Sequence, residues 1–90
     1  MEKVIITVLG KDSVGIIARV CTYFSENSIN ILDISQTIVD GYFNMMMITD
    51  CSVTKKTMAE MHEDLDKIGE QLGVNIRAQR AEIFDAMHRI

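Results

Sequence analysis

The Asp40-Gly41 pair constrains the fold of this chain more than any other feature of its sequence. Before it, residues 30–39 alternate apolar and polar side chains as a β-strand does, and residues 42–51 are predicted as the next strand. Asp-Gly between two such runs is the strongest short signal for a two-residue β-hairpin. A loop of this length also sets the strand register. The register pairs Ile38 with Phe43, Gln36 with Met45, Ile34 with Met47 and Leu32 with Thr49.

The rest of the sequence predicts two helices and two more strands. Residues 3–9 and 74–81 are expected to be strands, and residues 14–27 form a helix with Ser13 as its N-cap. The apolar stripe of this helix contains Ile17, Val20, Cys21 and Phe24. In the second helix, apolar residues recur at steps of three and four, from Met58 through Met61, Leu65 and Ile68 to Leu72. A capping box from Thr57 to Glu60 opens this helix, and Gly73 closes it.

These elements follow the order βαββαβ, which predicts an α+β, ferredoxin-like sandwich formed by a single domain over residues 1–90. We expect a four-stranded antiparallel sheet in the order 4-1-3-2, with both helices on its apolar face. The second strand, residues 30–39, then lies at an edge and contains neither proline nor lysine to protect it. Pairing with its own copy across a two-fold axis would cover that edge, so we expect a homodimer.

Composition and motifs exclude several classes of function. The net charge of -4 and the lack of a basic run argue against nucleic acid. No long apolar segment indicates a membrane, and two unpaired cysteines favour a cytoplasmic protein. We expect no cofactor and no metal, because Met45, Met46 and Met47 alternate in direction and the two histidines lack ligand spacing. No catalytic motif is present, and we expect no enzyme activity.

The loop of residues 10–15, Gly-Lys-Asp-Ser-Val-Gly, is the candidate binding segment. It is not a phosphate-binding P-loop, in which Gly-Lys-Ser/Thr would stand at the far end. It leads into a helix, whose first backbone N–H groups suit a carboxylate such as that of an amino acid. Gly15 would leave these groups unscreened. Alternatively, Gly15 lets the helix pack close to its neighbours.

Residues 12–18, Asp-Ser-Val-Gly-Ile-Ile-Ala, together with Asn30-Ile31, resemble the ACT domain, a small-molecule-sensing module found mostly in amino-acid metabolism. The resemblance covers nearly the whole chain. It is closest to an uncharacterised group of small stand-alone ACT proteins of bacteria and archaea, which look similar in residues 10–12 and 86–90. It extends more distantly to the ACT domains of the glycine cleavage system repressor and of formyltetrahydrofolate deformylase. Val14 departs from the proline that many ACT domains have.

The resemblance implies a ligand site between this loop and the start of the second strand of a partner chain. The candidate ligand-binding residues are Lys11, Asp12, Ser13, Val14, Gly15, Ile16, Asn30 and Gln36. Because the first two strands run parallel, Asp12 and Asn30 lie roughly 25 to 30 Å apart in one chain. Antiparallel pairing of two copies would bring Asn30 towards the partner's loop. Gln36, a polar residue on the apolar face, would bond either local backbone groups or the ligand.

Two functions remain open. The first is a non-catalytic, dimeric sensor that binds an amino acid or related small metabolite and passes this state to a metabolic enzyme or regulator. The alternative is a dimeric interaction module without a ligand, which would use the reverse sheet face or the C-terminal tail. The tail places Ile83, Phe84, Met87 and Ile90 at helical spacing, as in a short amphipathic helix.

Overall fold

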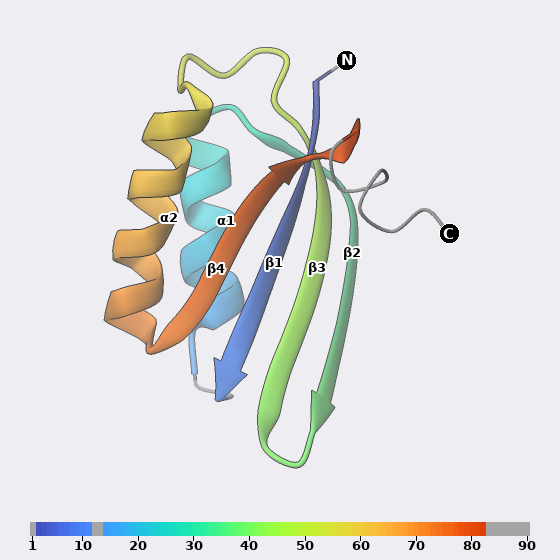
Figure 1. Cartoon of the computed structure of the whole chain (residues 1–90), viewed down its shortest axis with the longest axis vertical. Helices are drawn as coiled ribbons and strands as arrows, with labels where there is room; N and C mark the ends of the chain where they lie inside the picture. Colours follow the sequence, from blue (N-terminus) through green and yellow to red (C-terminus); the bar gives the residue numbers. More distant parts are fainter. Residues whose placement is uncertain (1, 12–13, 83–90) are drawn as a thin grey trace.

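The computed structural model describes residues 2–11 and 14–82. Its elements are β1 (Lys3–Lys11), α1 (Ile16–Glu26), β2 (Asn30–Val39), β3 (Tyr42–Asp50), α2 (Met58–Leu72) and β4 (Val74–Arg80). The strands form one antiparallel sheet in the order β2-β3-β1-β4, and both helices lie on one side of it (Figure 1). The predicted βαββαβ sandwich is thus confirmed. The predicted C-terminal helix, residues 83–90, lies outside the described residues.

The β2–β3 hairpin follows the predicted register over most of its length. Asp40 and Gly41 have φ angles of 54° and 80°, as a type I′ turn requires. The pairs of Ile38, Gln36 and Ile34 with their predicted neighbours are confirmed. The prediction that Leu32 opposes Thr49 is wrong. A β-bulge at this point makes Ile31 oppose Thr49, because β2 contains one residue more than β3.

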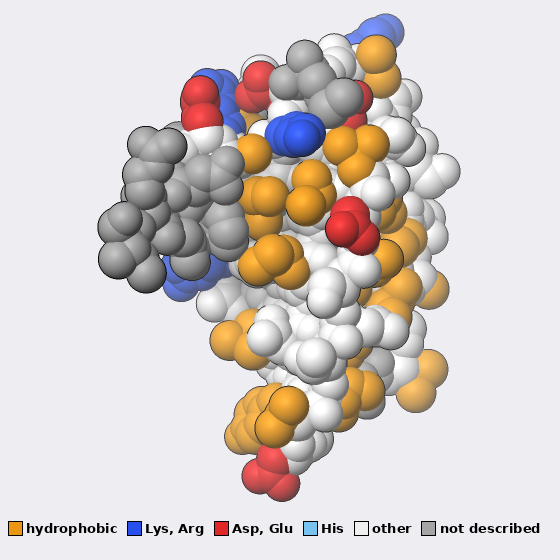
Figure 2. Space-filling model, turned by 90° about the vertical axis from the view of Figure 1, so that its right-hand side faces the viewer, with side chains coloured by type: hydrophobic (Ala, Val, Ile, Leu, Met, Phe, Trp, Pro, Cys, Tyr) orange, Lys and Arg blue, Asp and Glu red, His pale blue; other side chains and the backbone are white. Residues whose placement is uncertain are grey.

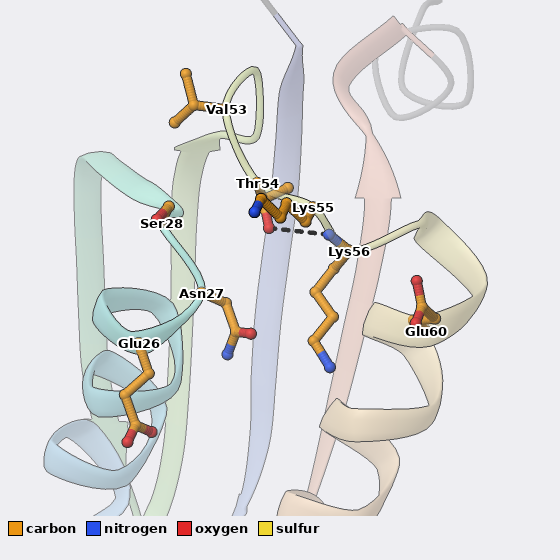
Figure 3. A pocket seen from close by; sticks show the side chains of 8 residues that line it. All are labelled: Glu26, Asn27, Ser28, Val53, Thr54, Lys55, Lys56 and Glu60. Carbon is orange, nitrogen blue, oxygen red and sulfur yellow. Dashed lines mark hydrogen bonds between the residues drawn. The ribbon is translucent and has the colours of Figure 1, made fainter.

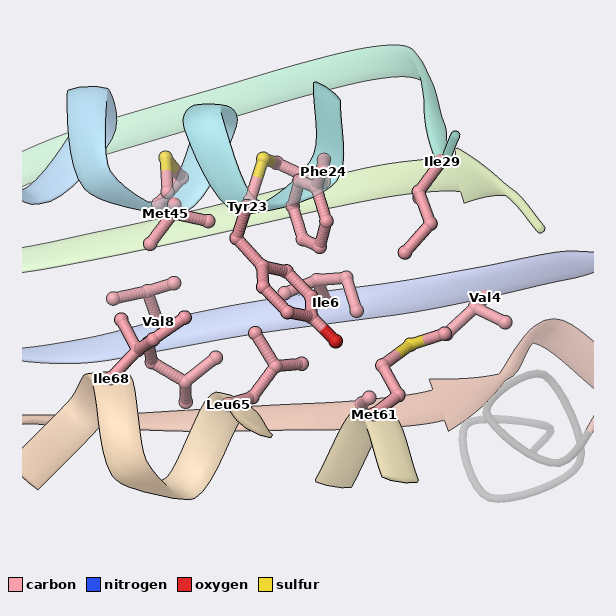
Figure 4. Packing of buried hydrophobic residues seen from close by; sticks show 14 of the residues in the cluster. Val4, Ile6, Val8, Tyr23, Phe24, Ile29, Met45, Met61, Leu65 and Ile68 are labelled. Carbon is pink, nitrogen blue, oxygen red and sulfur yellow. The ribbon is translucent and has the colours of Figure 1, made fainter. Parts of the chain in front are cut away.

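The core fills the space between the helices and three of the strands. Phe24, Met45 and Met47 are fully buried there, and Figure 4 shows side chains from both helices meeting those of the sheet. We expected the apolar face of β2 to be covered as well. Instead, every residue of β2 except Ile31 is exposed. The physical reason is its place at the edge of the sheet, where it has a neighbouring strand on one side only.

The two helices differ in how well their sequences predicted them. The start, end and capping box of α2 are confirmed. Helix α1 begins at Ile16, with Gly15 rather than Ser13 at the N-cap. Its buried face is formed by Ile16, Val20, Tyr23 and Phe24. Ile17 and Cys21, which we placed in the core, are exposed and half-buried respectively, because the helix turns a neighbouring stripe towards the sheet.

Candidate functional site

The candidate loop links the end of β1 to the start of α1. Lys11 ends β1 and is exposed, and the Val14 side chain is fully exposed to solvent. The next residues turn into the helix, where Ile16 is only 2% exposed and anchors the loop to the core. Asp12 and Ser13 lie outside the described residues. The loop therefore presents polar backbone and one exposed apolar side chain close to a buried anchor.

Gly15 is required by the backbone and not by close packing. Its φ angle is 91°, in the left-handed region of backbone conformation, which residues other than glycine adopt only at a cost in free energy. A Cβ atom added at this position would meet no atom of the described residues within 4 Å. Our alternative, in which Gly15 allows α1 to pack close to its neighbours, is therefore wrong. The space next to Gly15 is open.

The first turn of α1 has polar groups available for a ligand. Arg19 N donates to Gly15 O at 2.9 Å, which forms the first turn of the helix. The backbone N–H groups of Ile16, Ile17 and Ala18 lie too early in the helix to donate to an intrahelical carbonyl. They also lie at the positive end of the helix dipole. No side-chain cap is found at this end among the described residues. An anion could accept hydrogen bonds here.

Asn30 and Gln36 do not join this loop within one chain. Asn30 opposes Asp50 of β3, and Asp50 also opposes Lys3 at the start of β1. Lys11, at the end of β1, is level with Val39 at the other end of β2. A single chain thus holds Asn30 and Lys11 at opposite ends of the sheet, as the parallel strands predict. Gln36 is exposed and not buried, since nothing covers β2. Its amide therefore has no need of the local partners that we expected.

A cluster that the sequence did not reveal joins the two helices. The Tyr23 hydroxyl donates to Asp64 at 2.7 Å, and Lys56 pairs with the same carboxylate at 2.9 Å. The Lys56 ammonium, and then the Tyr23 hydroxyl, hold the pKa of Asp64 below its usual value. Burial, followed by the Asp64 carboxylate, raises the pKa of Tyr23 above its usual range. Asp64 thus has a structural role beyond the solvated acidic face that we predicted for α2.

A cavity of about 320 Å³ lies next to this cluster, between the end of α1 and the start of α2 (Figure 3). Its walls carry charges of both signs and come from three segments of the chain. The lining residues are Glu26, Asn27, Ser28, Val53, Thr54, Lys55, Lys56 and Glu60. Because it borders the C-terminal end of α1, it is separated from Gly15 by the length of that helix. The cavity and the candidate loop are distinct places.

The remaining residue types that suggested chemistry are placed as follows. Met45 and Met47 are buried while Met46 is 40% exposed on the other face, so the three sulfurs do not converge. Among residues 2–11 and 14–82, no group of three metal-ligating side chains is found. His62 Nε2 lies 2.8 Å from Ala78 O and ties α2 to β4. No helix in the described part of the chain has the length and apolar character needed to cross a membrane.

The fold and the loop together define a class of protein, and comparison with known proteins agrees with it. The family model of the ACT domain matches residues 2–79, so the chain belongs to the ACT domain family. It is similar to the UPF0237 protein of Bifidobacterium longum, with 60% identity over 90 residues and complete coverage of both chains.

Solved structures give the same picture. An ACT domain protein from Streptococcus pneumoniae aligns with a TM-score of 0.82 and 42% identity, over 97% of this chain and 98% of that one. A formyltetrahydrofolate deformylase from Pseudomonas syringae has a TM-score of 0.82 at 20% identity, over 89% of this chain and 28% of its own. A protein described as a glycine cleavage system transcriptional repressor has a TM-score of 0.74 at 21% identity, with coverages of 89% and 46%. The last two share the fold, and the expected resemblances are confirmed.

Proposed function

We propose that this chain is a non-catalytic regulatory protein that binds an amino acid or a related small metabolite as a homodimer. The ligand would lie between the loop of residues 11–16 of one chain and Asn30 of the other. One observation carries the proposal: β2 is an exposed edge strand whose apolar side chains have no cover in a single chain. A second copy paired along this edge would complete both the fold and the site.

The edge itself supports a β-strand partner. Ile34, Ile38 and Val39 are 43%, 60% and 68% exposed, although they belong to a regular strand. Figure 2 faces the side of the sheet away from the helices and shows further hydrophobic side chains exposed there. Long edge strands of this kind pair readily with another strand. Two copies of β2 in antiparallel orientation would form one eight-stranded sheet.

The dimer would supply what a single chain keeps apart. Asn30 starts β2, and Val39 at its other end is level with Lys11. Antiparallel pairing reverses one copy, so Asn30 moves towards the end of the partner sheet where α1 begins. The candidate site would then combine backbone N–H groups at the helix N-terminus with an amide from the second chain.

The chemistry of this combination favours a zwitterionic ligand. The N–H groups around Val14 and Gly15 would bind the carboxylate of an amino acid, and Asp12 would bind its ammonium group. Asn30 can both donate and accept hydrogen bonds, so it can contact either end of the ligand. Among the described residues of the site no nucleophile is paired with a base, and the chemistry of the site suits binding and regulation. A cytoplasmic enzyme or regulator would receive the signal.

A thermal-shift screen with the twenty amino acids tests the proposal. A ligand present at ten times its Kd stabilises the native state by about 1.4 kcal/mol, which raises the Tm of a domain of this size by about 5 °C or more. Asn30→Ala should abolish this shift and leave the dimer intact. Asn75→Ala, which changes an exposed residue of β4, serves as the matched control. A chain that stays monomeric at millimolar concentration would contradict the shared site.

The second candidate function is a dimeric interaction module. It is favoured by the reverse face of the sheet, where Leu9, Tyr42 and Met46 are 55%, 53% and 40% exposed. These three side chains lie opposite the helices and remain uncovered when β2 pairs with its copy. A dimer that responds to no metabolite in the screen would support this function over ligand sensing.

A further inference from the structure

The hairpin determines which backbone groups of β2 face the free edge. Val39 and Tyr42 flank a two-residue turn, so they exchange both backbone hydrogen bonds, and such pairs alternate along an antiparallel ladder. The N–H and C=O groups of Ile34, Gln36 and Ile38 therefore point away from β3. An independent contact agrees, because Ile34 N donates to Asp33 Oδ1 at 2.9 Å. Three residues thus form the regular part of the edge.

A symmetric pairing of two such edges has few possible registers. In an antiparallel ladder, an outward-facing residue must oppose an outward-facing residue of the other chain. With Ser35 on the two-fold axis, Ile38 would oppose the partner's Leu32, which lies in the bulge. With Thr37 on the axis, Ile34 would oppose the partner's Asp40, which lies in the turn. Only with Gln36 on the axis do all three outward residues find regular partners.

The side chains are complementary in the same register. Ile34, Gln36 and Ile38 oppose the buried residues of β3, so their side chains lie on the helix side of the sheet. Each Ile34 would stand beside the partner's Ile38, which covers two exposed apolar side chains at each end of the contact. Gln36 would stand beside the partner's Gln36, and an amide can both donate to and accept from its own copy.

We propose that the dimer forms in this single register, with Gln36 facing its own copy on the two-fold axis and Ile34 beside the partner's Ile38. The proposal rests on the proposed function and specifies its interface. Pairing requires each Ile34 N–H to leave Asp33 and donate across the interface, so Asp33 opposes association. In this register Asn30 lies two positions beyond the end of the partner's β2, about 7 Å past it, because the β-bulge takes up one residue of β2. It thus lies beyond the level of the partner's Lys11, which is itself level with Val39.

Three single-cysteine variants distinguish the registers. In a Cys21→Ala/Cys51→Ala background, we would introduce Ser35→Cys, Gln36→Cys or Thr37→Cys, all at exposed positions. A residue on the axis has its Cα about 5.5 Å from its copy, within reach of a disulfide, whereas one position off the axis gives about 8 Å and no bridge. Cross-linking by oxidised glutathione is followed on non-reducing gels, and circular dichroism checks each fold.

We expect Gln36→Cys to form covalent dimers at least about ten times faster than the other two variants. Faster cross-linking of Ser35→Cys or Thr37→Cys would overturn the register while leaving a β2 dimer and the proposed function in place. A background protein that sedimentation equilibrium shows to be dimeric, but in which no variant cross-links, would overturn the register and the shared pocket together. A monomeric background protein would overturn both proposals.

Discussion

Replacing Gly15 with alanine tests why a glycine begins α1. At a φ angle of 91°, a residue with a Cβ incurs about 1–2 kcal/mol of backbone strain. No steric clash with the described part of the chain is added, since a Cβ at this position would meet none of its atoms within 4 Å. Alanine also restricts the unfolded chain, which offsets about 0.5 kcal/mol or more of the strain. We therefore expect Gly15→Ala to lower the free energy of unfolding by about 1 kcal/mol.

Urea denaturation at one fixed protein concentration measures this change, and the fixed concentration matters because a dimer's stability depends on it. Gly15→Asn is the matched control, because asparagine tolerates the left-handed region better than alanine and its side chain can cap a helix. It should lose less than half as much stability. If Gly15→Ala unfolds at the wild-type urea midpoint, or if asparagine costs as much as alanine, the backbone explanation for this glycine is refuted.

Three further predictions concern packing, acid stability and association. An added Cβ at Gly69 would lie 2.6 Å from the backbone oxygen of Val74, so we expect Gly69→Ala to lower the unfolding free energy by about 1 kcal/mol despite alanine's better helix propensity. The lowered folded-state pKa of Asp64 contributes stability that is complete at neutral pH and is lost as the pH falls below about 4. Asp64→Asn should therefore flatten the acid limb of unfolding free energy against pH. Asp33→Ala removes, in each chain, a hydrogen bond that competes with pairing. At about 1 kcal/mol for each bond, this change should lower the dimer Kd measured by sedimentation roughly 30-fold. Asp33→Asn keeps the acceptor and should lower the Kd much less.

The elements predicted well are those that local chemistry specifies. Asp40-Gly41 predicted a two-residue turn, and both residues have the positive φ angles that such a turn needs. The capping box of Thr57 and Glu60 predicted the start of α2, and both of its hydrogen bonds are present. Each of these signals depends on residues at most three positions apart. They required no knowledge of the rest of the fold.

The candidate site was predicted only in part, and for a physical reason. Its separation into two ends of the sheet followed from strand direction, which the order of the elements implies. The left-handed conformation of Gly15 did not follow, because a glycine is compatible with several conformations and the loop selects one of them. The contact of Tyr23 with Asp64 was missed as well, since it joins residues 41 positions apart.

The sequence by itself determined the strands, the helices, their order and the hairpin register from the turn up to the bulge, because these depend on periodicity and on turn and cap chemistry. Only the tertiary structure decided which apolar side chains are covered. Ile34 and Ile38 lie on the same face as their neighbours Met47 and Phe43, yet the first two are exposed and the others are buried. Alternation assigns a side chain to a face, but its burial depends on the neighbours that the tertiary structure places around it. Here β2 lies at the edge of the sheet and has a neighbouring strand on one side only.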